Sequence, residues 1–182
     1  MIFPFSRREP RGPGTISTLY GMIVAQARLP YFYRDYAVAD TVNGRFDLIV
    51  LHLALVLERL MPEPALQSLG QGIFDRFCLD MDHNLREMGV GDLKVPKEMR
   101  RMGAAFYGCA QAYRAAWAAK DDELLVQALE RNIYGGSPSA VAPRLAAYTR
   151  EALRDLSAQP SERLGRGELH FPEPGQIPGV AS

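Results

Sequence analysis

The segment 40–60, DTVNGRFDLIVLHLALVLERL, constrains the fold more than any other part of the chain. It opens with polar turn residues, runs apolar over 48–56 with only His52 interrupting, and closes on a Glu-Arg pair before its last leucine. A helix drawn through this run carries apolar side chains on every side, so it has to be buried almost all round. Its uncharged part is far shorter than the roughly 20 residues that a bilayer-spanning helix needs. The segment therefore predicts the central helix, over about 43–61, of a soluble bundle.

Length and composition favour a single globular domain. The chain has 182 residues, of which 47 % are hydrophobic, and this is enough for one core. Its formal net charge is zero, whereas proteins dedicated to nucleic acids normally carry a basic excess, so we expect no DNA partner. Cys78 and Cys109 lie in helical patterns without CxxC spacing. This favours buried free thiols in a reducing compartment over a disulfide.

The periodicity of the chain predicts an all-α fold. Apolar residues recur at spacings of three and four, and the alternation typical of strands is absent. We expect a single-domain bundle of about six helices, over about 15–28, 43–61, 64–88, 96–120 and 122–134, with a sixth that ends near 158. Residues 15–158 would thus form one helical domain around the buried helix.

The two ends of the chain differ from this domain in composition. Residues 1–14 form a basic leader without the uninterrupted apolar segment of a signal peptide, so we expect a cytoplasmic protein. The leader fits either a flexible segment, which we favour, or a peripheral contact with the inner face of the cytoplasmic membrane. Residues 159–182 are Pro/Gly-rich and are expected to form an extended tail. Leu169 and Phe171 are the residues that could hold this tail on the bundle.

Two details of the core can be predicted from the longest helical patterns. The helix over 64–88 presents an apolar stripe, which consists of Leu66, Leu69, Ile73, Phe77, Met81, Leu85 and Met88. The next predicted helix contains Gly103 and Gly108. Because glycine lowers helix propensity, we expect both glycines to mark places where another helix packs closely.

One arrangement on the helix with the apolar stripe resembles half of a metal site. Asp80, His83 and Glu87 share a face at spacings of three and four. A carboxylate-bridged dimetal site needs a second helix with such a motif, and the chain, with three histidines, supplies none. Ion pairs at i,i+4, namely Arg76–Asp80, Asp82–Arg86 and His83–Glu87, explain the charges more simply. We therefore expect no metal and no other cofactor.

The polar start of the buried helix is a second candidate site. Asp47 in its first turn suits the positive end of the helix dipole, but Arg45 does not. Arg45 therefore either pairs with an acid of a neighbouring helix or contacts a partner, and the sequence leaves both open. His52 has no nucleophile or acid near it in the sequence, so we expect a core histidine with one hydrogen-bond partner rather than a catalytic base. Phosphate loops, nucleophile elbows and dinucleotide fingerprints are also absent, so we expect no enzyme.

A cluster of aromatic residues within 31–36 is the last candidate. It contains Tyr31, Phe32, Tyr33 and Tyr36, with an arginine and an aspartate among them. This composition is typical of an interface hot spot. A loop that plugs the end of the bundle would explain it as well, and we favour that interpretation.

Several segments together resemble the ubiquinol–cytochrome c chaperone family. They are LYGMIVAQARLPYFY (19–33), DTVNGRFDLIVLHLALVLERL (40–60), FCLDMDHNLREMGVGDLKV (77–95), MGAAFYG (102–108) and NIYGG (132–136). The resemblance extends over about 15–156. DMD-x-x-LREMGVGDL is its most specific part, because neither helix formation nor core packing demands this sequence.

The resemblance implies a non-enzymatic assembly chaperone for the cytochrome bc1 complex, or respiratory complex III, that binds newly made cytochrome b. Mitochondrial family members act with a small partner protein and associate with the ribosome, which makes both candidate partners here. A chaperone of this kind needs an adaptable apolar groove with a polar rim. The candidate partner-binding residues are Arg45, Asp47, Asp80, Asp82, Arg86, Glu87, Tyr31, Phe32 and Tyr33. The alternative is a helical module that binds a quinone or lipid in an apolar pocket near His52.

Overall fold

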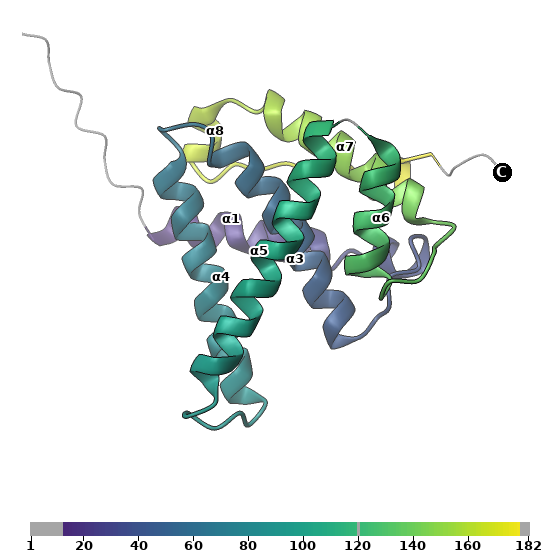
Figure 1. Ribbon diagram of the computed structural model, residues 1–182. Coiled ribbons are helices and arrows are strands. Elements are labelled where there is room, and N and C mark those ends of the chain that lie inside the picture. Colours follow the sequence, from purple (N-terminus) through teal and green to yellow (C-terminus); the bar gives the residue numbers. More distant parts are fainter. Residues whose placement is uncertain (1–12, 120, 179–182) are drawn as a thin grey trace, which may run out of the picture.

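The computed structural model describes residues 13–119 and 121–178 of the chain. The helices in these ranges are α1 Pro13–Ala27, α2 Pro30–Arg34, α3 Val42–Leu60, α4 Gln67–Glu87, α5 Val95–Ala119, α6 Asp122–Ile133, α7 Ala142–Ala158, α8 Ser161–Gly165 and the 3₁₀ helix η1 Pro174–Gln176 (Figure 1). The described residues contain no strand, so the predicted all-α class is confirmed. The six predicted helices correspond to α1 and α3–α7, whereas α2 and α8 are short additions. Most of the predicted leader lies outside the described residues.

Helix α3 runs through the middle of the fold, as predicted for this segment. Helices α1, α4, α5, α6 and α7 all pack against it, and every residue over 48–56 is buried. The helix starts where the Thr41 hydroxyl accepts a hydrogen bond of 3.1 Å from the Gly44 N–H, which satisfies a donor of the first turn. Among the described helices, none is long and apolar enough to cross a membrane.

His52 is a fully buried residue in the middle of α3, and both of its ring nitrogens have partners. Nδ1 lies 2.7 Å from the carbonyl oxygen of Leu48, and Nε2 lies 2.9 Å from the hydroxyl of Tyr148 on α7. Burial lowers the pKa of His52 to about 4, so the ring is neutral at physiological pH. The rings of Phe32, Tyr148 and Phe171 surround it at centroid distances of 5.1–5.6 Å. The histidine is therefore a core residue with two partners rather than the one predicted.

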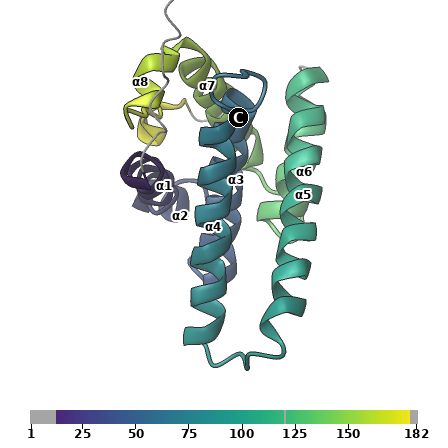
Figure 2. The ribbon, with the colours of Figure 1, turned by 90° about the vertical axis from the view of Figure 1, so that its left-hand side faces the viewer.

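Helices α4 and α5 form a long antiparallel hairpin. Figure 2 shows that the two helices extend beyond the rest of the fold to a common turn. The predicted stripe of α4 is buried from Leu66 to Leu85, but Met88 is 63 % exposed. The prediction was wrong for Met88 because α4 ends at Glu87, and Met88 belongs to the turn beyond the core. Cys78 lies on α4 and Cys109 on α5, and both are free, half-buried thiols.

The glycines of the hairpin lie in different surroundings from those predicted. A Cβ atom on Gly103 or Gly108 would have no neighbour within 4 Å, so the prediction of close helix packing at these residues is wrong. The close contacts lie on α4 instead. A Cβ atom on Gly70 would lie 2.9 Å from the Met61 sulfur, and one on Gly72 would collide with Ile16 of α1. The cost of Gly103 and Gly108 in helix propensity has no packing explanation in the structure.

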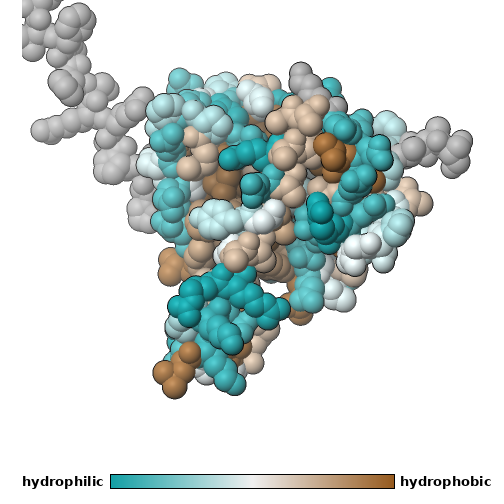
Figure 3. Space-filling model, viewed as in Figure 1, coloured by the Kyte–Doolittle hydropathy of each residue, from teal (hydrophilic) through white to brown (hydrophobic). Residues whose placement is uncertain are grey.

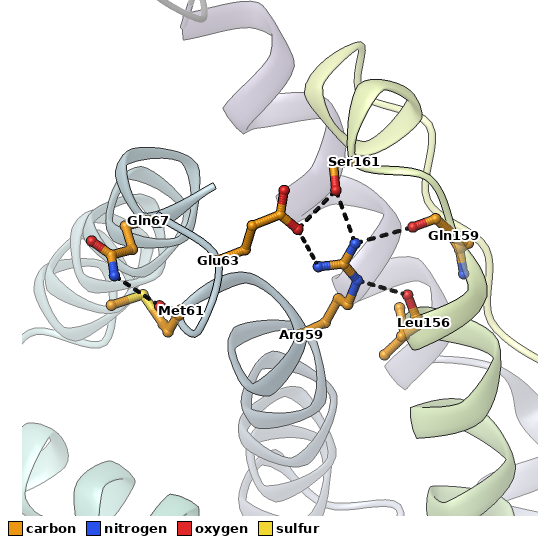
Figure 4. Close-up of polar contacts among 7 residues, drawn as sticks. All are labelled: Arg59, Met61, Glu63, Gln67, Leu156, Gln159 and Ser161. Carbon is orange, nitrogen blue, oxygen red and sulfur yellow. Dashed lines mark hydrogen bonds and ion pairs between the residues drawn. The ribbon is translucent and has the colours of Figure 1, made fainter. Parts of the chain in front are cut away.

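Arg59 joins the end of α3 to the α7–α8 turn (Figure 4). Its guanidinium donates to the carbonyl oxygens of Leu156 at 3.0 Å and Gln159 at 3.1 Å, and to the Ser161 hydroxyl at 3.1 Å. It also forms an ion pair of 2.9 Å with Glu63, which in turn accepts a hydrogen bond of 2.8 Å from Ser161. One side chain thus satisfies carbonyl groups at the C-terminal end of α7, where helical partners are missing.

The segment after α7 packs on the bundle rather than leaving it. Leu164, Leu169 and Phe171 are buried, which confirms the contacts predicted for the last two. The hydroxyl of Tyr36 donates a hydrogen bond of 2.7 Å to the carbonyl oxygen of Pro174. The short helices α8 and η1 in this segment were not predicted, because each is too short to show helical periodicity.

Replacing a core leucine of α3 should destabilise the protein far more than replacing a surface leucine. Leu53 is fully buried, so Leu53→Ala should lower the free energy of unfolding by about 2–5 kcal/mol through cavity formation. Leu124 of α6 is 47 % exposed, and Leu124→Ala is the matched control. Urea denaturation followed by circular dichroism measures both. Equal stabilities of the two variants would contradict the assignment of α3 as the core helix.

Removing the Arg59 side chain should also destabilise the fold, by about 1–3 kcal/mol, because partly buried acceptors would lose their charged donor. Arg101→Ala is the control, since Arg101 is exposed and forms only a 3.5 Å ion pair with Glu98. Arg101→Ala should change the free energy of unfolding by no more than about 1 kcal/mol. Urea denaturation of both variants tests the difference, and an unaffected Arg59→Ala protein would refute it.

Candidate partner-binding surfaces

The NGRFD motif at the start of α3 has a structural role at Gly44. This residue is buried, and a Cβ atom there would overlap the carbonyl oxygen of Ala39, so only glycine fits. Arg45 points outward and pairs at 2.7 Å with Asp40 in the preceding turn, where both side chains are more than half exposed. The alternative of an ion pair with a neighbouring helix is therefore wrong, because the acid lies five residues away in the sequence, and the contact with a partner remains a prediction.

Arg45 also borders a basic hollow of about 590 Å³. Arg28, Arg34 and Tyr33 contribute to the same hollow, so the structure brings Arg45 together with one residue of the aromatic segment. Asp40 supplies a negative charge at its edge. The hollow is open and is a candidate contact site for an acidic or polar group.

Asp47 lies in a different hollow from Arg45. Because α3 begins at Val42, Asp47 is in the second turn, and its predicted place in the first turn is wrong. Its carboxyl is half-buried and has no hydrogen bond or ion pair among the described residues. The other side chains that line this hollow are uncharged. This hollow has a volume of about 560 Å³ and lies between residues 37–44 and the turn after α6. Burial raises the pKa of Asp47 to about 6.

The acidic residues of α4 take part in separate pairs. The carboxylate of Asp80 accepts a hydrogen bond of 2.9 Å from the hydroxyl of Tyr20 on α1. The predicted pairs of Asp82 with Arg86 and of Glu87 with His83 are confirmed, at 2.7 Å and 3.5 Å, whereas the predicted pair of Arg76 with Asp80 is not formed among the described residues. Arg86 also pairs with an acid of the hairpin turn, Asp92. In the part of the chain that the structure describes, no three acidic, histidine or cysteine residues come together in a group that could hold a metal ion.

The aromatic segment 31–36 fills one end of the bundle. Phe32 and Tyr36 are fully buried, and Phe32 packs edge-on against Tyr148 at a centroid distance of 5.1 Å. The hydroxyl of Tyr33 donates a hydrogen bond of 2.9 Å to the carbonyl oxygen of Ala27. Tyr31 lies under the guanidinium of Arg34 at 5.0 Å. Of the three candidate residues here, only Tyr31 and Tyr33 have surface left for a partner.

An apolar groove that the sequence did not reveal lies between α3, α4 and α5. It has a volume of about 310 Å³ and opens to the surface between the two helices of the hairpin. Figure 3 shows apolar surface in this hollow, bordered by hydrophilic side chains. Its apolar lining consists of Ala54, Leu57, Met61, Phe74, Phe106, Tyr107 and Ala110. Its polar rim includes Arg114 and Glu58, which form an ion pair of 2.6 Å across α5 and α3.

Tyr107 is the most exposed large apolar side chain of this groove, at 64 %. Its ring contacts those of Phe74 and Phe106, both at a centroid distance of 5.7 Å. The residue directly follows Phe106, which is buried in the core, so it lies off the buried face of α5. An aromatic side chain next to the apolar stripe of a helix was the available signal for this groove, and the sequence prediction missed it.

The surroundings of His52 do not form a ligand cavity. His52 lines none of the three hollows described here. The space around its ring is filled by Phe32, Tyr148 and Phe171. The alternative of a quinone or lipid pocket at this position therefore lacks the space it needs.

Comparisons with known proteins agree with the fold and with the motifs. The model of the family described as "Ubiquinol-cytochrome C chaperone" matches residues 34–171. The crystal structure of the Cbp3 homolog from Brucella abortus is similar with a TM-score of 0.86 and 38 % identity, and the match covers 96 % of this chain and 97 % of that one. Protein CBP3, mitochondrial, from Saccharomyces cerevisiae is 28 % identical over 152 residues, which are 80 % of this chain but only 45 % of the yeast protein. The chain belongs to the ubiquinol-cytochrome C chaperone family.

Proposed function

We propose that this protein is a non-enzymatic assembly chaperone for the cytochrome bc1 complex and that it binds newly made cytochrome b. Membership of the family and the similarity to two Cbp3 proteins support the role in assembly. The observation that carries client binding is the open apolar groove between α3, α4 and α5. The proposal places the protein on the side of the membrane from which its client inserts.

The lining of the groove suits reversible binding of an apolar segment. Methionine and aromatic side chains adapt to different partners, and Met61, Phe74 and Tyr107 supply both kinds. Burial of one leucine- or phenylalanine-sized side chain contributes about 1.5–3 kcal/mol. The groove has room for only a few such side chains, and ordering the segment offsets part of the gain. The resulting affinity is moderate, as a chaperone that must release its client requires.

The rim of the groove explains how a helix could be oriented in it. Arg114 and Glu58 lie on opposite sides, and their pair is partly exposed, so it contributes little to folding. Gln71 and Gln111 add hydrogen-bonding groups along the two edges. An amphipathic or apolar helix laid in a groove of this kind is a common recognition mode. The polar groups can bind the exposed backbone ends or polar side chains of the client.

A charge introduced into the groove should strongly weaken client capture without unfolding the protein. Tyr107→Asp should weaken retention of cytochrome b by about tenfold or more, since about 1.4 kcal/mol of lost binding energy is sufficient. The measurement is pull-down of cytochrome b, translated in a cell-free system with detergent micelles, by the tagged full chain. Leu124→Asp, which introduces the same charge at an exposed apolar residue of α6, is the control. Equal capture by wild type and Tyr107→Asp would refute the groove as the binding site.

The charged residues that the motifs highlight form a second arm of the same experiment. Arg45 and Arg86 are about half exposed, so Arg45→Ala and Arg86→Ala should each change stability by no more than about 1 kcal/mol. If the groove is the site, both variants should capture cytochrome b as wild type does. Loss of capture by these variants but not by Tyr107→Asp would move the site to the charged surfaces.

The pH dependence of stability should show that the half-buried carboxyl of Asp47 has no charged partner among the described residues. Burial raises its pKa to about 6 in the folded protein, from 3.8 for a fully exposed aspartate. The folded state thus binds the proton more tightly, so the protonated acid favours folding below about pH 4, and this contribution is lost as the pH rises through about 6. Asp47→Asn should therefore be more stable than wild type at pH 7.5, and the difference should shrink at pH 4.5. Urea denaturation at both pH values measures it, and parallel pH profiles would contradict the assignment. An acidic residue that lowers the stability of the fold at neutral pH is typical of a functional site.

A further inference from the structure

The turn of the α4–α5 hairpin exposes large apolar side chains at the point farthest from the core. Leu93 is 98 % exposed and Met88 is 63 % exposed. Figure 3 shows apolar surface at this end of the hairpin, surrounded by hydrophilic side chains. The turn is convex, as Figure 2 shows, so it cannot enclose a segment of another protein. It can, however, enter a deformable layer.

The exposure of Leu93 results from an ordered backbone. The N–H of Val90 donates to the carbonyl oxygen of Leu85 at 3.0 Å, and the left-handed conformation of Gly89, with φ of 80°, closes the end of α4. The N–H of Lys94 donates to the carbonyl oxygen of Gly91 at 2.7 Å. Val95, which follows, is buried. The turn is held on both sides, and it projects Leu93 away from the protein.

The charged side chains near this turn that have no partner among the described residues are positive. Lys94, Lys97 and Arg100 are exposed, and their side chains have no hydrogen bond or ion pair among the described residues. Lys94 ends the turn, and Lys97 and Arg100 lie three residues apart on one face at the start of α5. The neighbouring acids have partners, and Glu87, next to Met88, pairs with His83 at 3.5 Å. Asp82 and Asp92 both pair with Arg86, and Glu98 pairs with Arg101.

We propose that the hairpin turn and the start of α5, residues 88–100, dock on the surface of an anionic lipid bilayer. Leu93 and Met88 enter the headgroup region, and Lys94, Lys97 and Arg100 contact lipid phosphates. Apolar side chains beside free lysines and arginines are the combination that peripheral membrane segments use, and their binding depends on anionic lipid and falls with salt. A turn of this size gives weak, reversible binding. The proposal rests on the turn itself and not on the identity of the client.

Docking in this way would also bring the groove to the membrane. Tyr107 lies 12 residues after Val95 on the same helix, which corresponds to about 18 Å along α5. A bilayer contact at the turn therefore leaves the groove within reach of a segment that has just emerged from the lipid.

Co-sedimentation with vesicles tests the proposal. The full chain should sediment with vesicles of phosphatidylcholine and phosphatidylglycerol, should not sediment with phosphatidylcholine alone, and should be released by high salt. Leu93→Ser, and separately the double variant Lys94→Glu/Lys97→Glu, should each lower the bound fraction about fivefold or more. All of the altered side chains are exposed, so thermal melting should not change.

Matched controls distinguish the turn from general effects of hydrophobicity and charge. Leu124→Ser alters an exposed leucine elsewhere, and Arg154→Glu/Arg166→Glu makes the same change in net charge on other exposed arginines. Both should bind vesicles as wild type does. Wild-type binding by Leu93→Ser, equal losses in the controls, or no vesicle binding by the wild-type chain would overturn the proposal. Capture of cytochrome b in micelles should be unaffected by Leu93→Ser, so this result and the groove experiment can fail independently.

Discussion

The burial of α3 on all sides is the constraint on which the rest of the structure depends. A helix that is apolar all round cannot lie at a surface, so five other helices have to cover it. The polar side chain within its apolar run, His52, is tolerated because both ring nitrogens have partners, and one of these, the Tyr148 hydroxyl, fixes α7 against α3. At the end of α3, Arg59 joins the same helix to the α7–α8 turn. The positions of α7, α8 and the following segment all follow from α3.

Periodicity predicted the long helices well because each of them buries a regular apolar face. Helix α3 was predicted over 43–61 and is observed over Val42–Leu60. The predictions failed where a residue's neighbours are far away in the sequence. Gly103 and Gly108 have open space around them, while Gly70 and Gly72 make the close contacts, and a propensity scale cannot distinguish these cases. The short helices α8 and η1 depend on tertiary packing and carry no periodic signal.

The candidate site was harder to predict from the sequence than the fold. Local pairs such as Asp82–Arg86 follow from helix geometry and were predictable. Arg45 instead pairs with Asp40 of its own turn, and part of the NGRFD segment is explained by the Gly44 backbone contact. The apolar groove combines side chains of three helices, from Ala54 to Arg114, which are 60 residues apart in the sequence, so no single motif encodes it. Tyr107, an exposed aromatic residue next to the buried Phe106, was the one local sign of the groove in the sequence.

Site-specific photo-crosslinking tests most directly whether the groove holds the client. A photoreactive phenylalanine analogue at position 107 lies in the groove, and the same analogue at position 124 lies on an exposed part of α6. Each protein is irradiated during translation of cytochrome b. The account predicts a cytochrome b adduct from position 107 and none from position 124. No adduct from position 107, with cytochrome b still captured by the protein, would contradict it.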